Sequence, residues 1–342
     1  MKRVCLAVAL LSFLVGTANQ VFAASVPPPE KFYEGKVITM VVPYRPGSGS
    51  DTYARMMMSY LQQAIPEVSV GIKNRPEGGG MVAINEFYNV VKPDGLTIMI
   101  APTGKWTEAM LGDPNVKHDI DKFQYLGGII GGEFAVTVAS TGKYTSVEAM
   151  KKGKGIKFGS SSPNALPGLA TVGAIEVLGL DAKVISGYEG SAPRTLALVQ
   201  GEIDAMLASV EVAEGYKKSG MKTQTLVVIS PTRSENFPNV PCVADFMKLS
   251  DYQQLLMKAI YQEARAWSVP PDTPPDRVQY LRDTFAKILK SKEFIQTAKG
   301  FAGDEWMGTW TGDQIQKQAV ELQKSSKELA KIYKELIKKY VQ

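Results

Sequence analysis

Short apolar runs alternate along the chain with longer amphipathic segments, and glycine- or proline-rich turns separate them. The runs "VITMVV" (37–42), "VSVGIKN" (68–74) and "LTIMIAP" (96–102) predict three strands. Between these runs, residues 52–64 and 81–91 place apolar side chains at helical spacing. This βαβαβ order predicts a parallel, largely buried sheet that is covered by helices.

The same alternation restarts after residue 126 and predicts a second α/β unit. The expected strands are 134–140, 155–162, 182–187 and 203–209, and the expected helices are 146–152, 169–179 and 193–201. Three long helices, 251–262, 275–291 and 312–340, then surround one strand candidate, "ARAWSVP" (264–270). Because a lone strand needs a sheet to join, we expect the chain to cross back to the first unit.

These patterns predict an α/β fold of two lobes with a ligand cleft between them. We assign residues 26–125 together with 260–342 to lobe 1 and residues 126–259 to lobe 2. A mature chain of about 320 residues agrees with two lobes, because single hydrophobic cores stop growing near ~250–300 residues. Ligands of open parallel sheets bind beyond the carboxyl ends of strands, so the turns that follow the strands are the candidate binding loops.

The N-terminal "MKRVCLAVALLSFLVGTANQVFAAS" is typical of a secretory signal peptide, because basic residues precede an apolar stretch and then small residues. We predict a signal peptide over residues 1–23, with cleavage after Ala23, although Ala24 fits nearly as well, and an exported protein. Cys5 leaves with this leader and Cys242 is then alone, so no intrachain disulfide is expected. Loss of the two leader cations lowers the formal net charge from +5 to +3, which gives little support to nucleic-acid binding.

The turn "YRPGSGSD" (44–51) is the first candidate binding loop. Gly47 and Gly49 let the backbone approach a ligand closely, and Ser50 or Asp51 is expected to cap the helix that follows. N–H groups at such a helix start are suited to hold an anion. Arg45 would add positive charge if it pointed inward, and an exposed Arg45 fits the sequence equally well. An ordinary capped turn without a ligand would show the same pattern.

Three further turns repeat this chemistry at later strand ends. They are "RPEGGGM" (75–81), "GSSSPNALPG" (159–168) and "GYEGSAPR" (187–194). Together the four turns are rich in backbone and hydroxyl donors and poor in fixed cations. Such a composition favours a carboxylate or another oxyanion as the ligand.

The parts of an enzyme are not evident in the sequence. His118 is the only histidine, and its loop-like surroundings, "NVKHDID", predict a solvated side chain. "TGKW" and "TGKY" resemble the end of a phosphate loop, but Trp106 and Tyr144 stand where that loop needs Ser or Thr. No metal-ligand spacing is visible. We therefore expect neither catalysis nor a metal or cofactor.

The succession "ITMVVPYRPGSGSDTYAR", "NRPEGGGMVAINEF" and "KPDGLTIMIAP" resembles, in order and spacing, the substrate-binding proteins of tripartite tricarboxylate transporters, also called the Bug family. The likeness continues through "FGSSSPNALPGLATVGAIEVLGL" to "AWSVPPDTPPDRVQYL" and covers essentially the whole mature chain. It implies a type II periplasmic binding protein fold. It also implies a monomer that clamps a small-molecule carboxylate between its lobes and delivers it to the membrane permease. A ligand-sensing component that docks on a membrane sensor kinase, or an enzyme on the same fold, remain the alternatives.

The resemblance also implies a set of ligand-binding positions, and we add Arg45, Ser50 and Thr103 to them. The candidates are Tyr44, Arg45, Gly47, Ser48, Gly49, Ser50, Asp51, Gly79, Gly80, Met81, Thr103, Ser160, Ser161, Ser162, Asn164, Tyr188, Gly190, Ser191 and Asp204. The chain departs from the family pattern at Arg45, where a small or apolar residue is usual, and at 164–166, where a turn leading to a histidine is common. Dicarboxylates, tricarboxylates, aromatic carboxylates and some amino acids or vitamins all stay compatible with these loops.

Overall fold

The computed structural model describes residues 29–65, 67–163, 166–188, 190–234, 237–258, 260, 262–302 and 308–341. The predicted signal peptide, residues 1–23, and the candidate Asn164 lie outside these ranges. Within them, no helix combines the length and the apolar character that crossing a membrane requires.

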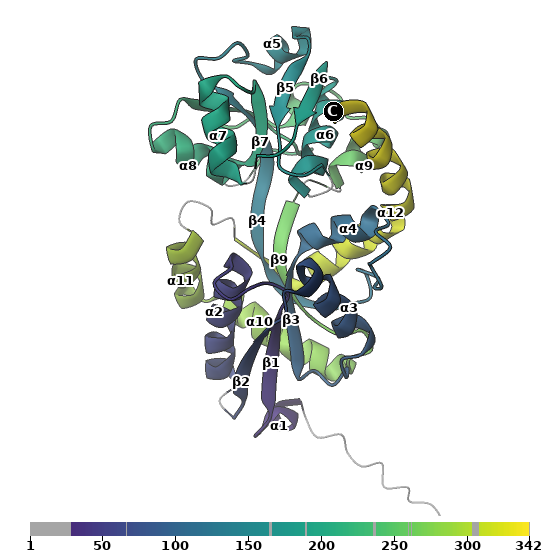
Figure 1. Cartoon of the computed structure of the whole chain (residues 1–342). Helices are drawn as coiled ribbons and strands as arrows, with labels where there is room; N and C mark the ends of the chain where they lie inside the picture. The colour runs from purple at the N-terminus through teal and green to yellow at the C-terminus, as the bar shows by residue number, and fades with distance from the viewer. Residues whose placement is uncertain are drawn as a thin grey trace, which may run out of the picture.

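Helices and strands alternate over most of the chain, as the sequence pattern predicts (Figure 1). The strands are β1 (Val37–Val42), β2 (Ser69–Asn74), β3 (Thr97–Pro102), β4 (Gln124–Ala139), β5 (Ile156–Gly159), β6 (Ala182–Ile185), β7 (Ala205–Ser209), β8 (Thr223–Val228), β9 (Gln262–Val269) and β10 (Thr309–Thr311). The α-helices are α1 (Pro29–Tyr33), α2 (Gly49–Ala64), α3 (Met81–Asn89), α4 (Trp106–Met110), α5 (Val147–Lys152), α6 (Leu166–Leu178), α7 (Ser191–Gln200), α8 (Val210–Lys218), α9 (Asp251–Lys258), α10 (Pro275–Lys290), α11 (Lys292–Ala302) and α12 (Gly312–Tyr340). Short 3-10 turns are η1 (Glu77–Gly80), η2 (Thr103–Lys105) and η3 (Val243–Asp245).

Lobe 1 is built on the predicted parallel strands. β1 lies between β2 and β3 and pairs parallel with both. Antiparallel β9 continues the sheet beside β3, with Pro102 opposite Arg265, so the expected return of the chain to the first sheet is confirmed. Met40 and Trp267 are buried in the core on one face of this sheet, and Phe87 and Tyr125 are buried on the other.

Strand β4 joins the two lobes. Its first half pairs with β9 and β10, and its second half pairs with β7 and β8. The sequence predicted only residues 134–140 as a strand, so the 16-residue length of β4 is a correction. The glycine pairs of "LGGIIGG" (126–132) hid the first half, because glycine is depleted in strands. The α/β class and the two lobes are confirmed, and Figure 1 shows β4 and β9 running side by side between them.

The directions of these strands bring all the parallel strand ends to the lobe junction. In lobe 1, β9 runs antiparallel to β4 and to β3, so the carboxyl ends of β3, β1 and β2 lie toward the Glu133 region of β4. In lobe 2, Ser209 at the end of β7 lies opposite Phe134 of β4, and β5 and β6 run parallel to β7. The turns that follow these strands in both lobes therefore face each other across the stretch of β4 between Ile129 and Thr137.

Helix α12 passes from lobe 1 to lobe 2 (Figure 1). Its first turns pack in the lobe 1 core through Ile315 and Ala319. Its later residues Leu329 and Tyr333 are buried among lobe 2 side chains, and the Tyr333 hydroxyl donates to the Leu256 carbonyl at 2.9 Å. The boundaries 26–125 with 260–342 and 126–259 stay a prediction.

The start of α12 is pressed against the backbone of β4. A Cβ atom on Gly312 would overlap the Tyr125 carbonyl oxygen. The same carbonyl accepts a hydrogen bond from Arg282 Nε at 2.8 Å, so it is held in place. Only glycine allows this close approach of helix and strand.

We expect Gly312→Ala to destabilise the protein by about 1–3 kcal/mol, because the new methyl group must displace the β4 backbone. Gly215→Ala is the matched control, since a Cβ on that helical glycine meets nothing within 4 Å. The control should be neutral or stabilising by up to about 1 kcal/mol. Urea unfolding of both variants measures the difference, and equal free energies of unfolding would contradict the tight α12–β4 contact.

Candidate binding site at the lobe junction

The first candidate loop joins β1 to α2, and Ser48 caps the helix. The Asp51 amide donates to Ser48 Oγ at 3.2 Å, and Ser48 has the extended backbone of an N-cap residue. The expectation that Ser50 or Asp51 caps α2 is therefore wrong. The serine three residues before Asp51 is the one whose hydroxyl reaches the free amide of the first turn.

Asp51 instead stabilises the loop through hydrogen bonds to its buried carboxylate. Its side chain is only 3% exposed and pairs with Arg55 through Oδ2–Nε and Oδ1–Nη2 contacts of 2.9 and 3.1 Å. The Gly47 amide and the Asn74 side-chain amide each donate to the same carboxylate at 2.9 Å. Burial acts to raise the pKa of Asp51, but the hydrogen bonds that its carboxylate accepts outweigh burial and lower the pKa to about 2.

This arrangement leaves backbone donors at the start of α2. The amides of Gly49 and Ser50 have no acceptor among the described residues, as is usual for the first turn of a helix. Gly49 is exposed, whereas Ser50 is buried. Tyr44 is partly buried, and its carbonyl accepts from the Asn74 side chain at 3.0 Å. The side chain of Arg45 is exposed.

The second candidate loop lies directly against the first. Gly78, Gly79 and Gly80 all have positive φ, which side-chain-bearing residues rarely adopt. A Cβ on Gly80 would overlap the carbonyl oxygen of Pro43, the residue that precedes the first loop. The glycines are therefore needed for the backbone of the two loops to touch. Met81 opens helix α3 and is buried.

The third strand end contributes an unexpected lysine. Thr103 is buried, and its hydroxyl accepts from the Ala264 amide at 2.8 Å, which ties the end of β3 to β9. Lys105 Nζ lies 3.8 Å from the position of a Cβ on Gly79, so this cation borders the second loop. Glu108 pairs with Lys105 at 2.5 Å. In the sequence analysis Lys105 belongs only to "TGKW", which does not complete a phosphate-loop motif. Its position just after a predicted strand is the signal that could have indicated a place beside the binding loops.

Arg265 is the second residue that the sequence missed. It lies on β9 opposite Pro102 and is half-buried. Its Nη2 and Nε atoms lie 3.8 and 4.0 Å from the position of a Cβ on Gly49. The cation is brought to the first loop by strand pairing between residues far apart in the chain, so no local pattern indicates it.

The lobe 2 loops are joined to each other by backbone hydrogen bonds. The Tyr188 amide donates to the Ser160 carbonyl at 3.1 Å, and the Gly187 amide donates to the Ser161 carbonyl at 3.0 Å. Ser160 is fully buried, and its hydroxyl has no partner in the described part of the chain. Ser161 is half-buried, whereas Ser162 is exposed.

The next turn continues the lobe 2 edge of the junction. Gly190 precedes helix α7 with a φ of 89°. The Tyr216 hydroxyl donates to Ser191 Oγ at 3.4 Å.

Asp204 is not brought to this edge. It precedes β7, at the amino end of the strand, and its carboxylate accepts from the Lys157 amide at 2.9 Å. The other lobe 2 candidates follow the carboxyl ends of β5 and β6, at the opposite edge of the sheet. A contact of Asp204 with a ligand at the junction therefore has no support from its position.

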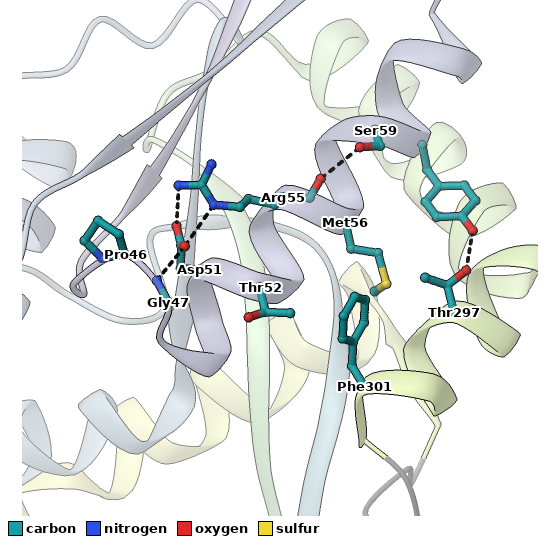
Figure 2. Close-up of a pocket in the computed structure, with 10 residues that line it drawn as sticks. Pro46, Gly47, Asp51, Thr52, Arg55, Met56, Ser59, Thr297 and Phe301 are labelled. Atoms are coloured by element: carbon teal, nitrogen blue, oxygen red, sulfur yellow. Dashed lines mark hydrogen bonds and ion pairs between the residues drawn. The ribbon is translucent and has the colours of Figure 1, made fainter.

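An apolar groove lies beside the first loop, between α2 and α11 (Figure 2). It has a volume of about 650 Å³ and shares only Gly47 and Asp51 with the predicted site. Figure 2 shows the Asp51–Arg55 pair at one end and Met56 facing Phe301 along the groove. At the other end, Tyr60 and Thr297 share a hydrogen bond of 2.8 Å.

The lone histidine is not solvated, so that prediction is wrong. His118 is only 9% exposed and packs against Phe123 and Tyr88. Its Nδ1 lies 2.9 Å from Asn85 Oδ1, and an amide oxygen only accepts, so Nδ1 carries the proton. Burial lowers the pKa of His118 to about 4, against a smaller raising effect of Asp119. His118 is therefore neutral at pH 7 and fixes its loop to α3.

No group of three or more His, Cys, Asp or Glu side chains in the described residues is arranged to hold a metal ion. Cys242 is buried as a free thiol.

Comparison with known proteins identifies one family and one fold. A family model described as "Tripartite tricarboxylate transporter family receptor" matches residues 54–337. Protein BugT of Bordetella pertussis (strain Tohama I) is 23% identical over 312 residues, which are 84% of this chain and 88% of BugT. The crystal structure of a TctC solute binding protein from Polaromonas is similar with a TM-score of 0.73 and 23% identity, over 90% of this chain and 99% of that chain.

Two other solved structures share the fold at lower similarity. MatC from Rhodopseudomonas palustris, solved with bound malate, has 17% identity and a TM-score of 0.58, over 88% of this chain and 99% of that chain. An R. palustris protein solved with adipate has 18% identity and a TM-score of 0.59, over 89% of this chain and 96% of that chain. These likenesses confirm the expected fold.

The Asp51 network predicts a pH-dependent stability. The pKa of Asp51 is lowered from 3.8 to about 2. Its ionised carboxylate therefore contributes about 2 kcal/mol to the free energy of unfolding above pH 4, and this contribution is lost as the pH falls toward 2. Asp51→Asn should therefore lose about 2 kcal/mol at pH 7, and its difference from wild type should shrink between pH 4 and pH 2.

Urea unfolding across this pH range measures the difference. Asp283→Asn is the matched control, because Asp283 is exposed on α10 and accepts a single hydrogen bond, from Gln279, among the described residues. The control should follow wild type at every pH. A pH-independent difference for Asp51→Asn would contradict the network.

Proposed function

The chain belongs to the tripartite tricarboxylate transporter receptor family, and from this membership we propose that it is an exported solute-binding protein that captures a small organic acid. In this proposal it works in the periplasm and delivers the acid to the permease of a tripartite tricarboxylate transporter. It binds its ligand without converting it.

The observation that carries the proposal is that the parallel strands of both lobes end toward the junction, on either side of the β4 stretch between Ile129 and Thr137. The loop after β1 offers the amides of Gly49 and Ser50, and the loop after β5 offers the hydroxyls of half-buried Ser161 and exposed Ser162. Donors on two sides of a junction suit an oxyanion, because a carboxylate accepts several hydrogen bonds at once. The proposed ligand therefore lies at the junction, with the first and second loops on one side and the lobe 2 loops on the other.

The proposed ligand class is a small dicarboxylic acid. Two proteins of the same fold were solved with malate and with adipate, which both carry two carboxylates. Citrate-like and aromatic acids belong to the same experiment, because the glycine-rich loops do not set the length of the ligand.

We propose that capture is coupled to a hinge motion at β4 and β9. The pairing of these strands shifts register between Ile130 and Glu133, beside the glycines of "LGGIIGG". A bulge with glycine weakens a sheet locally and bends it, so rotation of the lobes is least costly there. A ligand that contacts both lobes then stabilises the closed arrangement.

A thermal-shift screen of the mature protein tests the function. The panel contains malate, adipate, citrate and phthalate, each beside its monoamide, and the protein is first unfolded and refolded to remove carried-over ligand. An acid at 100 times its Kd adds about 2.7 kcal/mol of stability, which is readily seen as a higher Tm. We expect at least one of the acids to raise the Tm.

The same samples separate a binding protein from an enzyme. NMR of the released acid should show it chemically unchanged after incubation. A consumed acid would contradict the binding-only role, and a panel in which no carboxylate moves the Tm would contradict the proposed ligand class.

A further inference from the structure

The charged side chains around the lobe 1 loops are mostly paired. Asp51 pairs with Arg55, Arg75 with Glu86 at 3.0 Å, and Lys105 with Glu108. Each pair cancels its charge locally. These pairs shape the loops but leave little net charge to select a ligand.

Arg265 is different from these paired residues. It is half-buried, and no described carboxylate or carbonyl oxygen forms an ion pair or hydrogen bond with its guanidinium. The guanidinium lies over the ring of Tyr53, with its central carbon 5.4 Å from the ring centroid. It also borders Gly49 in the first loop, so its place is fixed on two sides.

A partly desolvated arginine without an acceptor carries a free-energy cost. Stacking on an aromatic ring compensates one face of the guanidinium, but the N–H groups in its plane still need acceptors. A carboxylate matches these N–H groups in geometry and charge, and forms two parallel hydrogen bonds with them. The position beside Gly49 places such a carboxylate at the first binding loop.

The two kinds of donor differ in what they select. A backbone amide donates to a neutral amide carbonyl as well as to a carboxylate, although the bond to the carboxylate is stronger, whereas a guanidinium also carries a positive charge and can form two parallel bonds with the anion. We propose that Arg265 binds a carboxylate of the ligand and makes the site select a carboxylate over the corresponding amide. This inference rests on the proposed function and adds the residue that enforces the charge of the ligand.

Calorimetry with matched ligands tests the assignment. The probe is whichever of malate, adipate, citrate or phthalate gives the largest thermal shift, compared with its own monoamide, in wild type, Arg265→Gln and Arg265→Lys. In wild type the acid should bind at least about tenfold more tightly than the monoamide. In Arg265→Gln the acid should lose about 10- to 100-fold in affinity, and the preference should fall below about threefold.

Arg265→Lys keeps the charge but not the two parallel N–H groups, so it should retain part of the preference. Arg277→Gln is the matched control. Arg277 also stacks on an aromatic ring, Phe32, but it donates to the Asp94 carbonyl before the amino end of β3, away from the loops. Arg277→Gln removes the same charge as Arg265→Gln and should keep the wild-type preference for the acid over the monoamide.

The outcomes separate the two proposals. If wild type binds none of the four acids, the proposed ligand class fails before Arg265 is tested. If wild type binds an acid and folded Arg265→Gln keeps the wild-type preference for acid over monoamide, the role of Arg265 is overturned and the function stands. If circular dichroism shows that Arg265→Gln does not fold, either of two other results overturns the role of Arg265. One is a wild-type preference for acid over monoamide below about threefold. The other is an affinity for the acid that is unchanged in Arg265→Lys.

Discussion

The pairing of β4 with β9 is the constraint on which the rest of the molecule depends. β4 belongs to the sheets of both lobes, and β9 runs antiparallel to it across the junction. Given these two directions, every parallel strand of either lobe must end with its carboxyl end toward the junction. The candidate binding loops of both lobes therefore lie at the junction because of backbone hydrogen bonding, and the loop side chains only modify this arrangement. Helix α12, packed in both lobes, adds a third connection beside the pair.

Within this frame, the lobe 1 loops are held by bonds inside the protein, so that their amides remain available to a ligand. Asp51 accepts four hydrogen bonds from the loop and its neighbours, and the approach of Gly80 to Pro43 fixes the second loop against the first. Preorganised donors of this kind lower the entropy cost of binding. Paired charges elsewhere leave Arg265 as the cation suited to read the charge of the ligand.

The sequence predicted the parts of the fold that local patterns determine. Apolar runs located β1 to β3, and the amphipathic pattern gave α12 over its full length. Local patterns failed where tertiary structure decides. The first half of β4 was hidden by its glycines, and His118 looked solvated although its loop folds onto α3. Arg265 reaches the loop only through the pairing of β9 with β3, which no spacing in the sequence reveals.

If the lobe junction is the binding site, the carboxylate of the ligand lies on the first loop. A crystal structure of the refolded mature protein with its best-binding acid would locate it. We expect carboxylate oxygens about 3 Å from the Gly49 or Ser50 amide and from the Arg265 guanidinium, with lobe 2 donors on the other side. An acid bound instead in the groove between α2 and α11, with the junction loops free of it, would show that the junction is not the binding site.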